Sequence, residues 1–331
     1  MTTKRRWTSW AFNCAARPLW PWRTRDRKVL TASHTPVLAE EALRWLRIEP
    51  GGTYVDATIG LGGHAVRIAS QLTTGRLIGL DRDAGALAIS SERLKDFGGK
   101  VVLVQADFSR IDEVAQELSL PPVQGILADL GVSSFQLDTA ERGFSFRLAG
   151  PLDMRMDSRS ATTAADIVNE TAESELADLL YRLGEERDSR RIARVIVRAR
   201  PIRSTEHLAT VVAGARTSRG RQKLHPATKT FLALRIAVNR ELEALGQFLK
   251  RASATLAPGG RWVVLSYHSL EDRMVKQEFR RLASEGVLNV LTRKVLRPSD
   301  AEIAANPRAR SAKMRVAEKL MPVTPAEKLA S

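Results

Sequence analysis

Three aspartates stand where neighbouring carboxylates could bind a ligand together, because each ends a short apolar run. The runs and their acids are residues 53–56 with Asp56, 77–81 with Asp81 and 125–129 with Asp129. Short apolar runs bounded by glycine or charge are typical of buried parallel strands. Ligands of open α/β sheets bind beyond the carboxyl ends of such strands. We therefore predict that the three carboxylates line one site for a nucleoside-containing cofactor.

The loop after the first run distinguishes between two classes of cofactor. Gly60, Gly62 and Gly63 follow Asp56 without forming the G-x-G-x-x-G pattern of dinucleotide-binding proteins. S-adenosylmethionine has no pyrophosphate, so its site needs glycines for close backbone approach and carboxylates for its ribose and charged groups. The pattern therefore favours S-adenosylmethionine over NAD. Because the spacing of Asp81 suits either ribose, a NAD-dependent oxidoreductase is an alternative.

Each of these signals has a plainer explanation when it is taken alone. A glycine-rich turn can be a tight connection between strand and helix, and an aspartate at a strand end commonly caps the next helix. The recurrence of acids at the ends of three strands favours the cofactor site.

The composition indicates a folded protein with a polyanionic partner. The chain has 331 residues, 44% of them hydrophobic, which is enough for one large domain or one domain with an insertion. Lys and Arg number 52 against 37 Asp and Glu, so the formal net charge is +15. This charge suits nucleic acid better than a small neutral metabolite, although by itself it indicates only nonspecific attraction.

Cysteine and histidine usage argues against a metal centre. Cys14 is the sole cysteine, which excludes an internal disulfide and cysteine-rich metal sites and favours a reducing compartment. The five histidines lack the spacing of a metal motif, so no metal is predicted. No apolar stretch reaches the roughly 18 residues that a membrane span requires. We therefore expect no membrane association and a cytoplasmic location.

Residues 1–33 differ from the rest of the chain. They contain four tryptophans, one acid and the cations Lys4, Arg5, Arg6, Arg17, Arg23, Arg25, Arg27 and Lys28. We predict a basic, Trp-rich, disordered extension. An RNA-contacting arm that uses cations and stacking, or an organellar presequence, are the alternatives.

The chain alternates strand and helix up to residue 138. Predicted strands cover residues 53–56, 77–81, 101–105, 125–129 and 261–266, and helices lie near 64–71, 85–94 and 111–118. The alternation predicts a doubly wound α/β sheet, closed by an antiparallel pair near residues 287–295 and 313–317. Because the rhythm stops after residue 138, we predict a discontinuous core of residues 34–138 and 228–331 around a helical insertion of residues 139–227.

Stripes of side chains indicate how the later helices pack. Leucines form one apolar stripe over residues 176–183. The next helix carries a basic stripe of Arg190, Arg194 and Arg198, which suits either phosphate contacts or a solvated face paired with glutamates. Residues 227–249 are predicted to form one long amphipathic helix that packs on the sheet.

Ten short motifs follow one another along the chain. They are HTPVL at His34, GLGGH at Gly60, LDRD at Leu80, DLGVSSFQLD at Asp129, ERGFSF at Glu141, GPLDMRMD at Gly150, GEER at Gly184, HPATKTF at His225, HSLEDR at His268 and NPRARS at Asn306. Together they closely resemble the ribosomal RNA small subunit methyltransferase H family over roughly residues 33–320. The resemblance implies a Rossmann-like, S-adenosylmethionine-dependent methyltransferase sheet with an inserted helical domain. It also implies methylation of the exocyclic N4 of one cytidine near the decoding site of 16S ribosomal RNA.

The resemblance further implies which residues contact the cofactor. They are Gly62, Gly63, His64, Asp81, Phe108, Asp129 and Gln136. Asp81 suits the ribose, Phe108 offers an apolar face to adenine, and Asp129 with Gln136 would hold the polar end near the transfer site. Judged from the residues alone, His64 would be a helix-start residue and Phe108 a core residue.

Cytosine N4 is a poor nucleophile, because its lone pair is conjugated with the ring. Acceptors aimed at its N–H groups would favour a pyramidal nitrogen and could take a proton. Many amino-methyltransferases carry D/N/S-P-P-Y/F after the fourth strand, whereas this chain has DLGVSS from Asp129. Our hypothesis is that Asp129 or another residue at the carboxyl edge of the sheet polarises N4, with Asp153, His268 and Asp272 as candidates to hold or deprotonate the base. HSLEDR could equally be a capped turn with surface ion pairs, and GPLDMRMD a salt-bridged linker.

The acceptor cytidine must be unstacked to reach a buried methyl group. The resemblance implies 16S ribosomal RNA as the partner, within the small ribosomal subunit, and a homodimer stays open. Further phosphate contacts are predicted at Arg308, Arg310, Lys313 and Arg315. A DNA amino-methyltransferase and a noncatalytic RNA-binding assembly factor are the alternatives.

Overall fold

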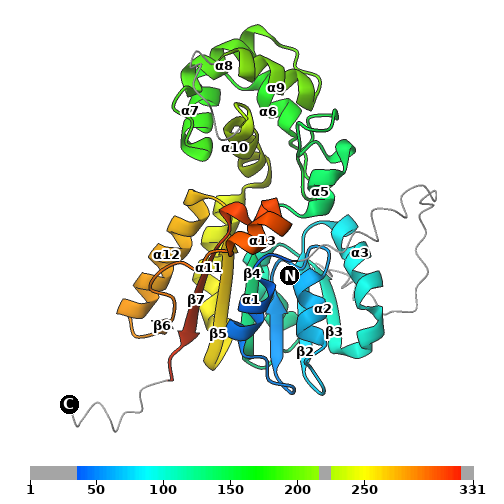
Figure 1. The fold of residues 1–331 in the computed structure, drawn as a ribbon, viewed down its shortest axis with the longest axis vertical. Helices are drawn as coiled ribbons and strands as arrows, with labels where there is room; N and C mark the ends of the chain where they lie inside the picture. The colour runs from blue at the N-terminus through cyan, green and yellow to red at the C-terminus, as the bar shows by residue number, and fades with distance from the viewer. Residues whose placement is uncertain (1–35, 216–224, 322–331) are drawn as a thin grey trace, which may run out of the picture.

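A single sheet forms the base of the molecule (Figure 1). The computed structural model describes residues 36–215 and 225–321, and within them seven strands pair in the order β3-β2-β1-β4-β5-β7-β6. Their bounds are β1 Thr53–Asp56, β2 Arg76–Asp81, β3 Val101–Gln105, β4 Val123–Asp129, β5 Leu256–Ser266, β6 Leu288–Val290 and β7 Lys313–Lys319. The first five strands are parallel, and β7 is antiparallel to β5 and β6. The predicted α/β class, the five parallel strands and the antiparallel pair are confirmed.

The register of the parallel strands brings their carboxyl ends to one edge. Asp81 lies opposite Gln105, the last residue of β3. Asp129 lies opposite Leu265 near the end of β5, and Asp56 ends the strand that pairs with both β2 and β4. The three predicted acids therefore share the edge at which open sheets bind ligands.

Helices cover both faces of the sheet. One face packs against α1 Ala39–Leu46, α2 Gly63–Ala69 and α3 Ala84–Leu94, and the other against α4 Ile111–Glu117, α11 Glu241–Thr255 and α12 Ser269–Ser284. Alternate strand side chains enter the two cores, so that Tyr54 faces the first and Val55 the second. Shorter elements are η1 Lys95–Lys100, η2 Phe108–Arg110, η3 Ala140–Arg142, α13 Asp300–Ala305 and η4 Pro307–Ser311.

A second group of helices, the helical layer, stands above the sheet (Figure 1). Its elements are α5 Ser134–Asp138, α6 Ala164–Glu170, α7 Glu173–Gly184, α8 Ser189–Arg198, α9 Thr205–Gly214 and α10 Thr228–Asn239. The layer has its own apolar core, in which Leu176 and Leu180 of the predicted leucine stripe are buried. Arg190, Arg194 and Arg198 lie on the exposed side of α8.

The long helix predicted over residues 227–249 is wrong. The structure has two helices, because Arg240 adopts a left-handed conformation with φ of 49° between α10 and α11. Phe231 packs in the core of the helical layer, whereas Phe248 packs against the sheet. The apolar periodicity continues through Arg240 without a glycine or proline, so the pattern could not show the change of direction. The chain therefore returns to the sheet after Arg240 rather than at residue 228.

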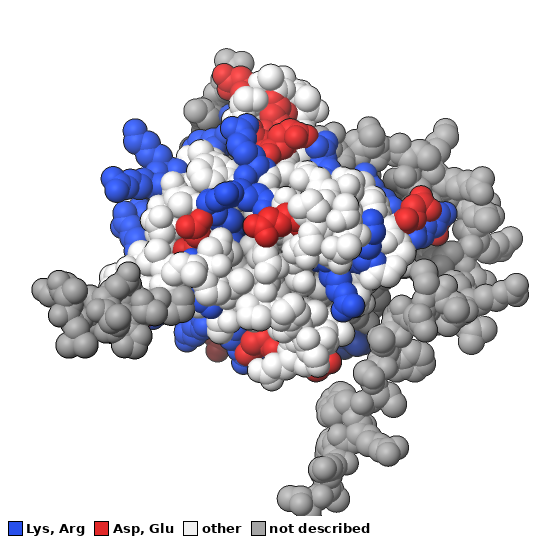
Figure 2. Space-filling model, turned by 90° about the horizontal axis from the view of Figure 1, so that it is seen from below, with Lys and Arg blue, Asp and Glu red and all other residues white. Residues whose placement is uncertain are grey.

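Three further expectations concern the N-terminal extension, membrane-spanning helices and the distribution of surface charge. The extension of residues 1–33, with Cys14, lies outside the described residues. Among residues 36–215 and 225–321, no helix combines the length and hydropathy needed to cross a membrane. On the face seen from below, away from the helical layer, the described Lys and Arg side chains are scattered with acidic side chains among them (Figure 2).

Candidate active site

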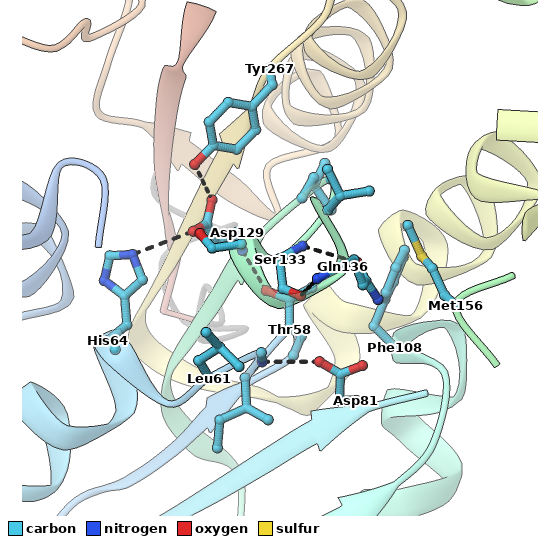
Figure 3. A pocket seen from close by; sticks show the side chains of 18 of the residues that line it. Thr58, Leu61, His64, Asp81, Phe108, Asp129, Ser133, Gln136, Met156 and Tyr267 are labelled. Carbon is cyan, nitrogen blue, oxygen red and sulfur yellow. Dashed lines mark hydrogen bonds and ion pairs between the residues drawn. The ribbon is translucent and has the colours of Figure 1, made fainter. Parts of the chain in front are cut away.

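A cavity of about 330 Å³ opens at the carboxyl edge of the sheet, below the helical layer. Its walls come from the ends of the parallel strands and from the helical layer, and they include Asp81, Phe108, Asp129, Tyr267 and Met156 (Figure 3). Asp56 does not line the cavity, because its buried carboxylate turns back and accepts a hydrogen bond from the Thr58 amide at 3.2 Å. Two of the three predicted acids thus face the ligand space directly.

The loop between β1 and α2 requires glycine. Gly60 and Gly62 have φ of 50° and 76°, in the left-handed region that side chains disfavour. Asp81 fastens this loop, since its Oδ2 accepts from the Gly60 amide at 3.0 Å and its Oδ1 from the Asp83 amide at 2.8 Å. Burial raises the pKa of Asp81 to about 6, although these hydrogen bonds oppose the shift. The carboxylate is thereby fixed at the cavity wall, where ribose hydroxyls can donate to its remaining lone pairs.

His64, Asp129 and Tyr267 meet beside the cavity (Figure 3). The Tyr267 hydroxyl donates to Asp129 Oδ1 at 2.8 Å, and His64 Nε2 lies 3.6 Å from Asp129 Oδ2. Burial and the Asp129 charge raise the pKa of Tyr267 well above its usual 10, so the phenol stays a donor. His64 is 5% exposed, and neither of its ring nitrogens has a hydrogen-bond partner among the described residues. A polar ligand group in the cavity would satisfy this imidazole.

His64 and Asp129 both lie close enough to Asp56 to affect its pKa. Burial raises the pKa of Asp56 to about 7, with the Asp129 charge adding to the shift while His64 and the Thr58 amide oppose it. Near neutral pH this carboxyl is therefore protonated much of the time. Because protonated Asp56 is neutral, less negative charge lies near the Asp129 carboxylate.

Phe108 places an aromatic ring in the cavity wall. Its ring packs edge-on against Phe248 with 5.3 Å between centroids, and the Arg82 guanidinium carbon lies 5.9 Å from its centroid. Because these neighbours fix the ring from two sides, its remaining surface can pack against a flat base.

Gln136 lines the cavity, but its amide group is already engaged. Its Oε1 accepts from the backbone at the start of α5, and its Nε2 donates to Asp83 Oδ2 at 2.8 Å. The same Asp83 oxygen accepts from Arg142 Nη2 at 2.7 Å, and this nitrogen also donates to the carbonyls of Arg155 and Met156 at 2.9 and 3.0 Å. Gln136 therefore acts as a brace between the loops after β2 and β4.

Three other candidates for catalysis do not line the cavity. Asp153 accepts from Arg155 at 2.9 and 2.7 Å, and Asp272 accepts from Arg315 at 2.7 Å. Burial alone would raise the pKa of both carboxyls, but the hydrogen bonds from the arginines outweigh it and lower the pKa. His268 is the N-cap of α12. Their placement favours the salt-bridged linker and the capped turn, because nearness along the chain does not fix which way a side chain faces.

Two predicted phosphate contacts are used inside the protein. Arg315 is 9% exposed, and its ion pair with Asp272 takes it out of reach of RNA. Lys313 Nζ lies 3.5 Å from the same carboxylate. Both residues belong to β7, where Lys313 begins the strand and Arg315 pairs with Val264 of β5, rather than to a surface loop. Arg308 lines the cavity instead, and Arg310 is exposed.

The polar residues of the cavity wall that the sequence did not single out include Tyr267, Arg235, Glu241 and Glu271. Tyr267 directly follows β5, so the strand-end rule that found Asp129 could have found it. Arg235 and Glu241 also line the cavity, but they lie on α10 and α11, where periodicity indicated only an apolar stripe. No local signal distinguishes them from surface charges.

The residues present fit S-adenosylmethionine. Left-handed glycines allow close backbone approach, Asp81 can accept from a ribose, and Phe108 can pack on adenine. The unsatisfied nitrogens of His64 suit the charged amino-acid end, and the nearby Asp129 suits a cationic sulfonium.

Comparison with known proteins gives one consistent result. The model of a family described as the MraW methylase family matches residues 31–320. The ribosomal RNA small subunit methyltransferase H of Solibacter usitatus is 50% identical over 285 residues, which are 86% of this chain and 99% of that protein. Proteins of the same name from Koribacter versatilis and a Cyanothece species are 49% and 50% identical, covering 88% and 87% of this chain and 96% and 95% of theirs. The chain belongs to the MraW methylase family.

Proposed function

We propose that this protein methylates the exocyclic N4 of a cytidine in 16S ribosomal RNA, near the decoding site, with S-adenosylmethionine as methyl donor. The names of the relatives support small-subunit ribosomal RNA as the substrate, and the resemblance of the motifs implies the cytidine and its position. One observation carries the chemistry. Asp129 stands at the cavity with one carboxylate oxygen bound by Tyr267 and the other toward His64.

When bound, S-adenosylmethionine supplies an electrophilic methyl group. The chain's own residues would hold and orient the cofactor. Asp81 would accept hydrogen bonds from the ribose, Phe108 would cover the adenine, and His64 would bind the amino-acid end. The cavity below the helical layer would bury much of the bound cofactor. Alignment of nucleophile, methyl carbon and sulfur accounts for most of the rate that such an enzyme must provide.

Asp129 acts on the nucleophile, which is the N4 amino group of the cytidine. A bond forms between N4 and the methyl carbon while the carbon–sulfur bond breaks, and N4 loses one proton. The Asp129 oxygen that Tyr267 leaves open accepts a hydrogen bond from N4–H and then takes this proton. Tyr267 is a positioning residue, since it acts through Asp129 and keeps that carboxylate in one orientation.

The experiment that tests the proposal is nucleoside mass spectrometry of small ribosomal subunits that lack the modification, incubated with the protein and S-adenosylmethionine. We expect new N4-methylcytidine with the wild type and a rate about 10³-fold lower with Asp129→Asn. Asp272→Asn is the matched control, since this acid lies outside the cavity in its own ion pairs, and it should keep the wild-type rate.

Other outcomes would support the alternatives. Methylation of duplex DNA with none of ribosomal RNA would show a DNA amino-methyltransferase. Binding of S-adenosylmethionine and of the subunit without any transfer would show a noncatalytic assembly factor.

A further inference from the structure

The cavity extends past the residues assigned to the cofactor. Its far wall holds a cluster that we call the seam group, which consists of Arg235, Glu241, His268 and Glu271. Three of the four line the cavity, and His268 lies directly behind them. They come from α10, α11 and the start of α12, so the group sits where the helical layer meets the sheet.

Arg235 and Glu241 form a two-pronged ion pair. Arg235 Nε donates to Glu241 Oε1 at 2.8 Å and Nη2 donates to Oε2 at 2.7 Å. The two side chains are 13% and 9% exposed, so both charges have been taken out of water. The desolvation of such a pair offsets most of its attraction, and an apolar pair of equal volume would stabilise the fold at least as well. Stability alone therefore gives no reason for these charges in a cavity wall.

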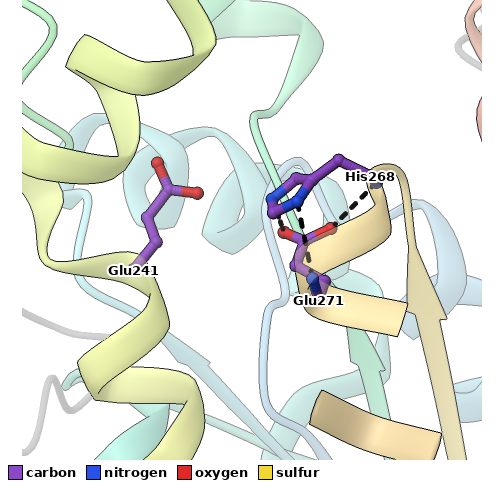
Figure 4. A group of neighbouring side chains, drawn as sticks. All are labelled: Glu241, His268 and Glu271. Atoms are coloured by element: carbon purple, nitrogen blue, oxygen red, sulfur yellow. Dashed lines mark hydrogen bonds and ion pairs between the residues drawn. The ribbon is translucent and has the colours of Figure 1, made fainter. Parts of the chain in front are cut away.

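His268 flanks the group at the start of α12. Its Nδ1 accepts from the Glu271 amide at 3.4 Å, so in the neutral ring the proton is on Nε2. Nε2 lies 3.0 Å from Glu271 Oε1, so this ring is tied to Glu271. The His268 side chain is only 9% exposed. Glu241 faces this ring and Glu271 across a gap (Figure 4). One carboxylate oxygen or ring nitrogen from each of the three residues lies within 4.8 Å of the other two.

These groups match the hydrogen-bonding face of cytosine. O2 and N3 of cytosine accept hydrogen bonds, and the N4 amino group donates two. The Arg235 guanidinium can donate to O2 or N3, while the Glu241 carboxylate can accept from one N4–H and leave the other for Asp129. Uracil presents a donor at N3 and an acceptor at O4, so the same wall would oppose it.

We infer that the seam group is the binding site of the acceptor base and that Glu241 with Arg235 selects cytosine. The inference rests on the proposed function, because it names how the base of that reaction is held. The N4–H that Glu241 binds stays on nitrogen during transfer, and the N4–H that faces Asp129 is the one that leaves.

The test measures the affinity of the protein for two kinds of unmodified small subunit, each added as a competitor in the methylation assay. One kind has the target cytidine, and the other has uridine at that position. We expect the wild type to bind the cytidine subunit about tenfold more tightly. Glu241→Gln should bind both equally and lower kcat/KM by at least about tenfold, with S-adenosylmethionine affinity unchanged. Glu243→Gln is the matched control, since this glutamate lies on the same helix in an exposed pair with Arg240.

Two results would overturn the inference. Retention of the cytidine preference by Glu241→Gln would show that the pair only braces the junction of α10 and α11. A rise of Tm with Mg²⁺ or Zn²⁺ in the wild type, absent from Glu241→Gln, would assign the group to a cation. In either case formation of N4-methylcytidine by the wild type would leave the proposed function standing.

Discussion

A single hydrogen bond from Tyr267 decides how the Asp129 carboxylate lies. Tyr267→Phe removes this bond with little change in volume, and we expect single-turnover methylation to slow about tenfold while S-adenosylmethionine affinity stays unchanged. Tyr54→Phe is the matched control, because that buried hydroxyl accepts from the Glu49 amide at 2.7 Å outside the cavity. It should lower Tm and leave the rate alone. Equal slowing in both variants would contradict a positioning role.

Asp56 makes stability depend on pH. Its pKa is about 7 in the fold against 3.8 for an ordinary carboxyl, so between these values only the folded state keeps the proton. Stability therefore falls as pH rises from about 4 to 7. Asp56→Asn mimics the protonated form, and we expect Tm to rise by roughly 2–4 °C at pH 8 and to change little at pH 4. Thermal unfolding at both pH values measures this, and a lower Tm at both would refute it.

Helix α8 presents its arginines away from its apolar side. Arg190 and Arg198 are exposed, while Arg194 lies 3.4 Å from Glu173. We expect the double variant Arg190→Ala with Arg198→Ala to weaken binding of the small subunit. The slope of log affinity against log salt concentration should become shallower by about one to two units. Arg281→Ala on α12, where Glu278 and Glu285 pair with the arginine, should leave the slope unchanged, and a similar loss there would contradict a specific role for α8.

At the scale of elements, the sequence was sufficient wherever a signal is local. Strand β3 has the bounds that were predicted, since a short apolar run between charges leaves few alternatives. The break at Arg240 could not be predicted, because its left-handed conformation is imposed by packing on both sides rather than by its own side chain. The same break placed residues 228–239 in the helical layer.

At the scale of the whole molecule, the cavity joins residues that no spacing rule connects. Asp81 and Asp129 were predictable, because both end parallel strands. Arg235 and Glu241 reach the same cavity only through the way the helical layer meets the sheet. Asp153 shows the converse, since a motif near the site can turn its carboxylate to a neighbouring arginine. Local sequence patterns thus identify candidate residues, whereas the tertiary structure decides which of them meet in one cavity.

The brace on Asp83 connects the two halves of the cavity. Asp83 follows the cavity-lining Asp81, and through Arg142 it is tied to the backbone of residues 155 and 156, which leads into the helical layer. A ligand that orders one end of this connection must alter the free energy of the other. By thermodynamic reciprocity, whatever factor the cofactor adds to the affinity for RNA, RNA must add to the affinity for the cofactor. At a given concentration, the occupancy of either site would then depend on whether the other site is filled.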